Sequence, residues 1–298
     1  MMPVGPGIPH QMPSKKTQTR PFGVCRLTGK TGPFVDSHII PAALTRPSSP
    51  GSPLYQHGDG LRPTRRWTSW YDPVLVTADG EKYLSDLDNW AIAVLRQHRL
   101  VWSGWGDEVG LGGHFPTSFE GVGARVVEGI DSKKLRLFFH SLLWRSAAST
   151  LRELNNIYLI DEDLELLKSA ILGVDEPPLS FYPVQLTQLS TRGAIHNQSP
   201  APVVKFVPNP FVLGGTPIAI PTYRFYLDGL IAHVHRATPL GYGVEALGNL
   251  ILGAEDSILL STVTFETSNQ ALDLAEAMGQ FGASPPAEDL QKAESPRD

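Results

Sequence analysis

The chain has 298 residues, of which 41% are hydrophobic, enough for one large domain or two ordinary ones with a well-formed core. Its formal net charge of -5 argues against a generally basic, histone-like coat for nucleic acid, although a local basic patch is compatible with that charge. A single cysteine, Cys25, excludes an intrachain disulfide and a four-cysteine zinc site, and no apolar run is long enough for a membrane helix.

Both ends of the chain are polar and rich in proline. Residues 1–20 and 283–298 carry too little apolar surface to offset the entropy of ordering, so we expect two disordered tails. The first of them also lacks the apolar stretch of a signal peptide. We therefore expect a cytoplasmic protein that does not associate with membranes.

The first block of structure is expected over residues 21–105. It opens with two short apolar segments on either side of the glycine-rich stretch 28–32, which predicts a β-hairpin. Residues 45–73 follow, dense in proline, glycine and serine, and these predict a long loop.

A helix is predicted after this loop, over residues 81–100. Asp79-Gly80 marks a turn, and from Leu84 to Leu95 the apolar residues recur at helical spacing. Hairpin, loop and helix in this order form a ββα unit.

A second block is expected over residues 106–282, separated from the first by the glycine-rich stretch 104–129. Its pattern changes from strongly apolar helices to short β-type runs and then to a closing helix. The expected fold class is α+β, with a small antiparallel sheet in this C-terminal domain. The predicted helices are 133–154, 161–173 and 268–282, and the predicted strands lie within 179–189, 201–208, 211–227, 230–237 and 257–267.

Basic and aromatic side chains alternate within the predicted loop. Arginine with neighbouring tryptophan suits contacts to phosphate together with stacking on bases, which predicts a nucleic-acid-binding segment. The competing interpretation is a solvated loop whose tryptophans anchor it to the core. The residues concerned are Arg62, Arg65, Arg66, Trp67 and Trp70.

Four short segments carry a resemblance to a known family. They are Cys25-Arg26-Leu27-Thr28, Ser37-His38-Ile39-Ile40-Pro41, the stretch 83–89 and Ser141-Leu142-Leu143-Trp144-Arg145. Their order and approximate spacing resemble the HNH-like (ββα-metal) endonuclease superfamily, in particular a bacterial branch with a Ser-His-Ile-Ile-Pro motif, over about half of the chain.

The resemblance implies a zinc clamp that this sequence has largely lost. Members of the branch hold a structural zinc with two cysteine pairs, whereas the matching positions here are Cys25, Thr28, Ser85 and Asp88. Hydroxyl groups are weak zinc ligands. We therefore expect no structural zinc.

The resemblance also assigns roles in phosphodiester hydrolysis. His38 falls on the position of the general base, and Asn89 falls where the superfamily has its final His or Asn. Asp88 is the best remaining carboxylate for Mg²⁺ or Mn²⁺, and Asp36, on the same face of a strand as His38, is expected to orient the imidazole or to hold a water. Without the family, His38 is interpreted as a core histidine bonded to a backbone carbonyl, and Asp88 and Asn89 as helix caps.

These assignments lead to two hypotheses of function. The first is a metal-dependent HNH-like endonuclease that cleaves DNA, in phage defence or a mobile element and with a possible protein partner in a defence complex. The second is a catalytically degenerate member that only binds nucleic acid or protein. His233 and His235, which alternate along a predicted strand, lack an evident third ligand, so a structural role is favoured for them.

Overall fold

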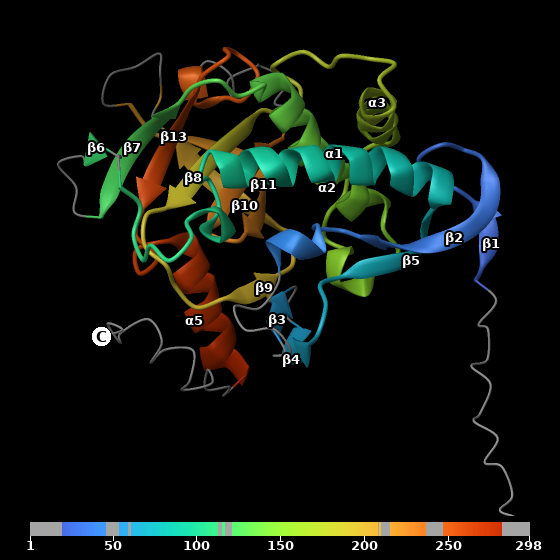
Figure 1. The fold of residues 1–298 in the computed structure, drawn as a ribbon, viewed down its shortest axis with the longest axis horizontal. Coiled ribbons are helices and arrows are strands. Elements are labelled where there is room, and N and C mark those ends of the chain that lie inside the picture. The colour runs from blue at the N-terminus through green and yellow to red at the C-terminus, as the bar shows by residue number, and fades with distance from the viewer. Residues whose placement is uncertain are drawn as a thin grey trace, which may run out of the picture.

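The computed structural model describes residues 20–45, 54–58, 61–112, 115–116, 121–207, 209, 215–236 and 247–281. The predicted tails therefore lie outside the described residues, except for Arg20. The fold is α+β, with three sheets and helices that cover them (Figure 1). In the described part of the chain, no helix has both the length and the apolar character needed to cross a bilayer.

The predicted N-terminal hairpin is confirmed. Strands β1 (Phe22–Val24) and β2 (Thr31–His38) pair in an antiparallel register around a tight turn, in which Gly29 has a φ of 71°. Strand β5 (Tyr71–Thr77) pairs with the other edge of β2 and leads directly into helix α1. Strands β2 and β5 with α1 therefore occur in the order of a ββα unit.

The predicted loop 45–73 contains strands. Its described residues form a hairpin of β3 (Leu54–Gly58) and β4 (Leu61–Arg66) and the start of β5. Strand β9 (His196–Gln198) pairs in parallel with β3 and completes a three-stranded sheet. The loop prediction is wrong here because the strand that stabilises β3 lies about 140 residues away in the sequence.

Helix α1 (Ala78–Gln97) begins before its predicted start. Asp79 and Gly80 lie in its first turn, so the predicted turn at these residues is wrong. A Cβ atom on Gly80 would lie 2.5 Å from Cys25 Sγ. The glycine is therefore explained by the close approach of the N-terminal turn to the helix, and not by a turn of its own.

The second block contains a sheet of seven strands, larger than the small one predicted. Its neighbouring strands are antiparallel except for the parallel pair of β13 and β8. Two of its strands, β6 and β7, lie in or next to the glycine-rich stretch that was expected only to separate the blocks. The order is β10 (Ala201–Val207), β11 (Ile218–Leu227), β12 (Leu230–His235), β8 (Val184–Leu189), β13 (Ile258–Val263), β7 (Val122–Val127) and β6 (Phe115–Pro116).

Among the described residues, three further α-helices lie around this sheet: α2 (Ser132–Ala148), α3 (Asp161–Ile171) and α5 (Asn269–Phe281). All three confirm helices predicted from the sequence, although α2 ends before its predicted limit of 154. Residue 149, the first after α2, has extended backbone geometry. The side chains of Ser149 and Thr150 instead bind Asp72 of β5, which explains the early end.

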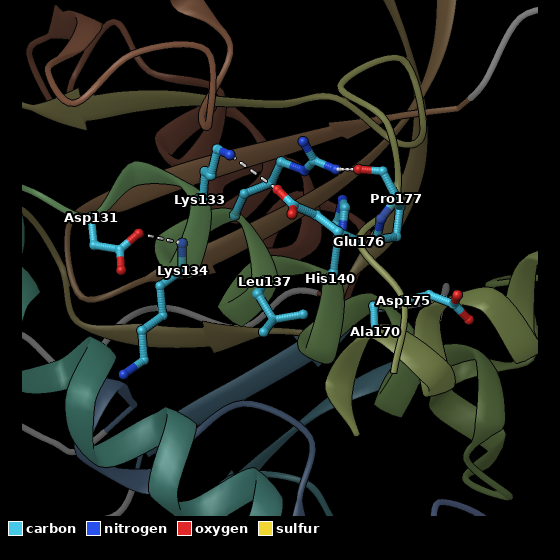
Figure 2. A pocket seen from close by; sticks show the side chains of 10 residues that line it. Asp131, Lys133, Lys134, Leu137, His140, Ala170, Asp175, Glu176 and Pro177 are labelled. Carbon is cyan, nitrogen blue, oxygen red and sulfur yellow. Dashed lines mark hydrogen bonds and ion pairs between the residues drawn. The ribbon is translucent and has the colours of Figure 1, made fainter. Parts of the chain in front are cut away.

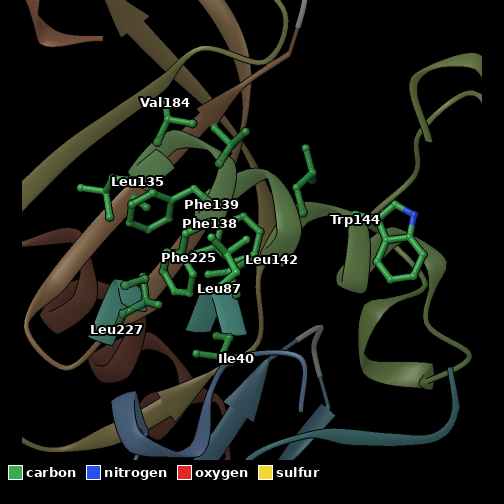
Figure 3. Packing of buried hydrophobic residues seen from close by; sticks show 14 of the residues in the cluster. Ile40, Leu87, Leu135, Phe138, Phe139, Leu142, Trp144, Val184, Phe225 and Leu227 are labelled. Atoms are coloured by element: carbon green, nitrogen blue, oxygen red, sulfur yellow. The ribbon is translucent and has the colours of Figure 1, made fainter. Parts of the chain in front are cut away.

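The hydrophobic core is continuous across the predicted boundary at residue 105. Helix α2 lies between α1 and the large sheet, and its Phe138 and Phe139 are fully buried. In Figure 3, Leu87 from the first block approaches the same cluster as Phe225 of β11. The two blocks therefore share one core, and side chains from both can meet at one site.

Candidate active site

His38 lies at the last position of β2, at the edge of the shared core. Its ring is half-buried, its Nε2 lies 3.1 Å from Thr68 Oγ1, and its centroid is 6.0 Å from that of Tyr71 on β5. The ring nitrogen therefore contacts a side-chain hydroxyl and not the backbone carbonyl that the core interpretation requires. The backbone oxygen of His38 accepts a hydrogen bond from Arg145 Nη1 at 3.2 Å.

The surroundings of His38 favour its neutral form. Burial lowers its pKa below the usual 6.5, and the positive charge of Arg145 acts in the same direction. The carboxylates of Asp36 and Asp88 oppose both effects. At neutral pH the neutral imidazole is therefore the favoured form, which a proton acceptor requires.

Asp88 forms an ion pair with Arg145 of α2. Nη1 and Nη2 of the arginine donate to the two carboxylate oxygens at 2.9 and 2.6 Å. The Arg145 side chain is 1% exposed and that of Asp88 is 14% exposed. Because Arg145 also binds the His38 carbonyl, this pair fixes the end of β2 against α1 and α2. The metal role of Asp88 stays a prediction, but its contacts show a structural role.

The two predicted helix caps are not caps. Helix α1 begins at Ala78, so Asp88 and Asn89 both lie well inside it. Asn89 is exposed, whereas Asp88 faces the buried Arg145. The structure therefore brings Asp88 near His38 but provides no contact that joins Asn89 to them among the described residues.

Glu81, in the first turn of α1, is a half-buried acid that the sequence analysis missed. Burial raises the pKa of its carboxyl, and the negative charge of Asp88 raises it further. The Ser37 hydroxyl and the positive charge of Arg145 lower this pKa. Its Oε2 is buried without a hydrogen-bond partner. The Arg145 charge therefore acts on two carboxyl groups, of which only Asp88 forms an ion pair with it. Glu81 precedes Leu84 by three residues, so helical spacing could have placed it on the buried face of the helix, but nothing in the sequence indicates Arg145 as its neighbour.

The four positions that the resemblance matches to a zinc clamp lie apart. Cys25 Sγ packs against Gly80 in the first turn of α1, whereas Asp88 lies eight residues further along, about 12 Å in an α-helix. Ser85 Oγ donates to the backbone oxygen of Lys82 at 3.1 Å, and Thr28 N approaches the Cys25 sulfur at 3.4 Å. These side chains do not converge on one tetrahedral centre.

A metal site of several protein ligands does not fit the residues around His38. In the described ranges, no group of three or more His, Cys, Asp or Glu side chains could hold a metal ion. Asp36 is exposed, lies where the β2–β5 register shifts, and its charge reaches His38. Because Mg²⁺ keeps several waters and needs only one or two carboxylates when a phosphate is bound, Asp36 fits such an ion.

Two adjoining hollows lie next to His38, of about 260 and 270 Å³. The second is lined by Thr68 and Tyr71, the two residues that contact the His38 ring. We call the pair the β4 groove. The residues that line both hollows are Gln56, Arg66, Trp70 and Glu153; the first is also lined by His57, Gly58, Arg62 and Thr64, and the second by Ser69, Pro73 and Leu151.

The structure separates the predicted nucleic-acid-binding residues into two groups. Arg62 and Arg66 line the β4 groove, and Trp70 is buried in its wall at 5% exposure. Arg65 alternates with them along β4 and does not line either hollow, whereas Trp67 is 69% exposed. Trp70 therefore confirms the anchoring interpretation for one tryptophan, and Trp67 remains available for stacking.

The far wall of the groove comes from the segment that follows α2. Asp72 of β5 is fully buried, and its Oδ2 accepts from Ser149 Oγ, Thr150 N and Thr150 Oγ1 at 2.7–3.1 Å. This attachment places Leu151 and Glu153 beside the groove. Asp72 was not singled out from the sequence, where a lone Asp before a proline predicts only a turn.

We expect the Arg62→Ala/Arg66→Ala double variant to weaken nucleic-acid binding and to flatten its salt dependence. Each phosphate contact contributes close to one unit to the slope of log K against log salt concentration, so the slope should fall by roughly two units. Fluorescence anisotropy with labelled DNA at several salt concentrations measures this. The matched control is Arg65→Ala, whose side chain lies outside the groove; an equal slope for double variant and wild type would assign the two arginines to another role.

Another hollow, of about 410 Å³, lies at the start of α2 (Figure 2). Its basic residues already have partners. Lys133 Nζ lies 3.1 Å from Glu176 Oε1, and Arg136 donates to the carbonyl oxygens of Pro177 and Pro178. His140 Nε2 lies 2.9 Å from the Tyr182 carbonyl oxygen. This arrangement joins α2 to the following loop, and we assign no ligand to it.

His233 and His235 are buried on one face of β12, as a structural role predicts. His235 Nδ1 lies 3.1 Å from Thr222 Oγ1, and Arg224 Nε donates to His233 Nε2 at 3.3 Å. Burial is the main cause that lowers both pKa values, and the Lys205 charge adds to it. Both histidines are therefore neutral members of a polar layer in the sheet.

No protein-family model matches the chain, and no curated protein or solved structure matches it either. The HNH-like resemblance therefore stays a prediction that depends on the motif residues and on the geometry around His38.

Proposed function

We propose that the chain is a metal-dependent, HNH-like endonuclease that hydrolyses phosphodiester bonds of DNA. The main support is the position of His38, a neutral imidazole at the end of β2 beside a groove that two arginines line. The order of β2, β5 and α1 agrees with a ββα unit. The cytoplasmic setting, in phage defence or a mobile element and with a protein partner, belongs to the same proposal and depends on the resemblance.

In this mechanism His38 accepts a proton from the attacking water. We assign the tautomer in which Nε2–H donates to Thr68 Oγ1, which leaves the lone pair on Nδ1. Arg145 holds the His38 backbone by its carbonyl oxygen, so the ring keeps its position while the proton is transferred. Arg62 and Arg66 position the phosphate backbone along the groove.

A divalent ion, Mg²⁺ or Mn²⁺, would be held by Asp36 together with waters and the phosphate oxygens of the substrate. When bound, it would neutralise charge that develops on the phosphate during hydrolysis. In this arrangement Asp88 keeps its ion pair with Arg145, and Asn89 stays on the exposed side of α1. Neither residue is required to hold the ion.

The direct test is a cleavage assay with purified protein on plasmid, single-stranded DNA and RNA, with Mg²⁺, with Mn²⁺ and with EDTA. Cleavage of DNA that requires a divalent ion is the expected result. Binding without cleavage of any of these substrates would contradict the proposal. It would favour the second candidate, a degenerate nucleic-acid-binding module. The observation that supports this candidate is that both carboxylate oxygens of Asp88 already bind Arg145.

We expect Asp36→Asn to raise the Mg²⁺ concentration needed for half-maximal cleavage by about 10–100-fold. The change removes a charged oxygen ligand, and losses of this size follow from changes around a metal site. Thermal stability should not change, because Asp36 is exposed. Asp86→Asn, an exposed carboxylate on α1 next to Lys82, is the control. An unchanged metal requirement in Asp36→Asn would assign the ion to other residues.

A further inference from the structure

Buried polar groups without partners surround the β4 groove. Gln56, His57 and Trp70 are 7%, 5% and 5% exposed, and all three line it. Gln56 Oε1, His57 Nε2 and Trp70 Nε1 have no hydrogen-bond partner. A folded chain normally pairs such atoms, so three of them around one hollow indicate a ligand that supplies the missing donors and acceptors.

These groups differ in the kind of partner that they need. The Gln56 oxygen and the Glu153 carboxylate are acceptors, whereas the indole N–H of Trp70 is a donor. Arg62 and Arg66 add two positive charges at the open side, where both are exposed. A ligand that matches must carry N–H donors, a ring acceptor and a negative charge.

His57 contributes as a neutral group and not as a third cation. Its ring stacks on that of His196 from β9 at a centroid distance of 5.2 Å. Burial lowers the pKa of His57 to about 3 and that of His196 to about 4. His196 Nδ1 lies 2.9 Å from the Ala194 carbonyl oxygen, which fixes the second ring behind the first.

The volume of the groove limits the size of the ligand that it can hold. Each hollow, at 260–270 Å³, is slightly smaller than the roughly 300–1,000 Å³ of pockets for drug-sized ligands. This volume suits one nucleotide and not a double helix. The second hollow reaches Thr68 and Tyr71, so the nucleotide would lie directly next to the His38 ring.

We infer that the β4 groove binds one unstacked nucleotide beside His38 and prefers bases that carry an exocyclic amino group. The amino group donates to Glu153 and Gln56, the Trp70 N–H donates to a base acceptor, and the phosphate contacts Arg62 or Arg66. The inference rests on the proposed function in one respect, since it takes the groove as the path of the nucleic acid. Thymine and uracil lack the amino group and offer only the N3–H as a donor, so at least one of the two acceptors would stay unpaired.

The test measures binding in EDTA, so that cleavage plays no part. The probes are a short labelled dT strand and the same strand with a single dC, dA or dG, with affinities from fluorescence anisotropy. We expect the substituted strands to bind at least about fivefold more tightly, the lower limit for one good polar base contact. Equal affinities for all four strands would overturn the inference.

Two variants connect the preference to the groove. Glu153→Leu and Gln56→Leu should each remove most of the preference, whereas Glu162→Leu, the same change at an exposed position of α3, should keep it. Glu153 is only half-buried, whereas Gln56 is 7% exposed, so the Glu153 variant is expected to fold even if Gln56→Leu does not. A preference that persists in Glu153→Leu with an unchanged melting temperature would overturn the inference.

Mononucleotides distinguish a strand site from a site for free nucleotides. If dCMP displaces the strand more effectively than dTMP, the inference holds and the site also accepts free nucleotides; if neither does while the strand preference remains, it holds for strands only. Cleavage is scored separately. A base preference without cleavage keeps the inference and removes the endonuclease, whereas cleavage without any base preference does the reverse.

Discussion

His38→Ala is expected to reduce DNA cleavage by about 10²–10⁴-fold and to leave the melting temperature close to that of the wild type. Loss of a general base has an effect of this size, because the water must then lose its proton without a positioned acceptor. The ring is only half-buried and contacts Thr68 and Tyr71, and the hydrogen bond to Arg145 uses the backbone oxygen, which alanine keeps. Few contacts that stabilise the fold are therefore lost.

The pH dependence of cleavage gives an independent measure of the same role. A general base must be unprotonated, and burial holds the pKa of His38 below 6.5. The rate should therefore reach a plateau at neutral and alkaline pH and fall as the pH decreases through this lowered pKa. Melting temperatures measured over the same pH range distinguish protonation of His38 from acid unfolding of the protein.

His98→Ala, at the end of α1, is a control that removes another partly exposed imidazole. A His38→Ala variant that cleaves as fast as the wild type would exclude His38 as the base. A variant with a strongly lowered melting temperature would instead support the core interpretation of this histidine.

Asp88→Ala is expected to lower the free energy of unfolding by about 3–5 kcal/mol. The change leaves the guanidinium of Arg145, which is 1% exposed, buried without its bidentate partner, and an unpaired buried charge has a cost of this order. Glu81, whose carboxyl also senses Arg145, can offset part of the loss and favours the lower end of the range. Urea denaturation of the variant measures the change.

Two further variants test whether the loss of stability in Asp88→Ala comes from the unpaired charge of Arg145. Asp86→Ala, an exposed carboxylate on the same helix, should change stability by less than about 1 kcal/mol. The double variant Asp88→Leu/Arg145→Leu should be less destabilised than the sum of its single changes, since it removes both charges together. If Asp88→Ala instead lost cleavage with unchanged stability, the metal role predicted for Asp88 would be supported over the structural one.

Local signals in the sequence were sufficient for part of the fold. The hairpin around Gly29 and the helices α1, α3 and α5 follow from turn residues and apolar periodicity, which depend on neighbours in the chain. The β3–β4 hairpin was missed because its third strand, β9, lies far away in sequence. Gly80 was interpreted as a turn because its actual reason, the contact with Cys25, is also a tertiary one.

The same distinction applies to the site. A motif of consecutive residues identified His38, and its placement at the end of β2 agrees with that prediction. The motif around Trp144 contained Arg145, but nothing in it indicated the ion pair with Asp88, 57 residues earlier. Gln56 and His57 carry no signal at all, because what distinguishes them is burial without a partner.

The attachment of residues 149–153 to Asp72 has a consequence for synthesis of the protein. A nascent chain that has not yet reached Arg145 contains His38 without the guanidinium that holds its backbone, and the groove without its Glu153 wall. Even a fully folded first block would then have an incomplete site. If the proposed function holds, a truncated product that ends near residue 140 should therefore cleave no DNA, which a cleavage assay with the fragment measures.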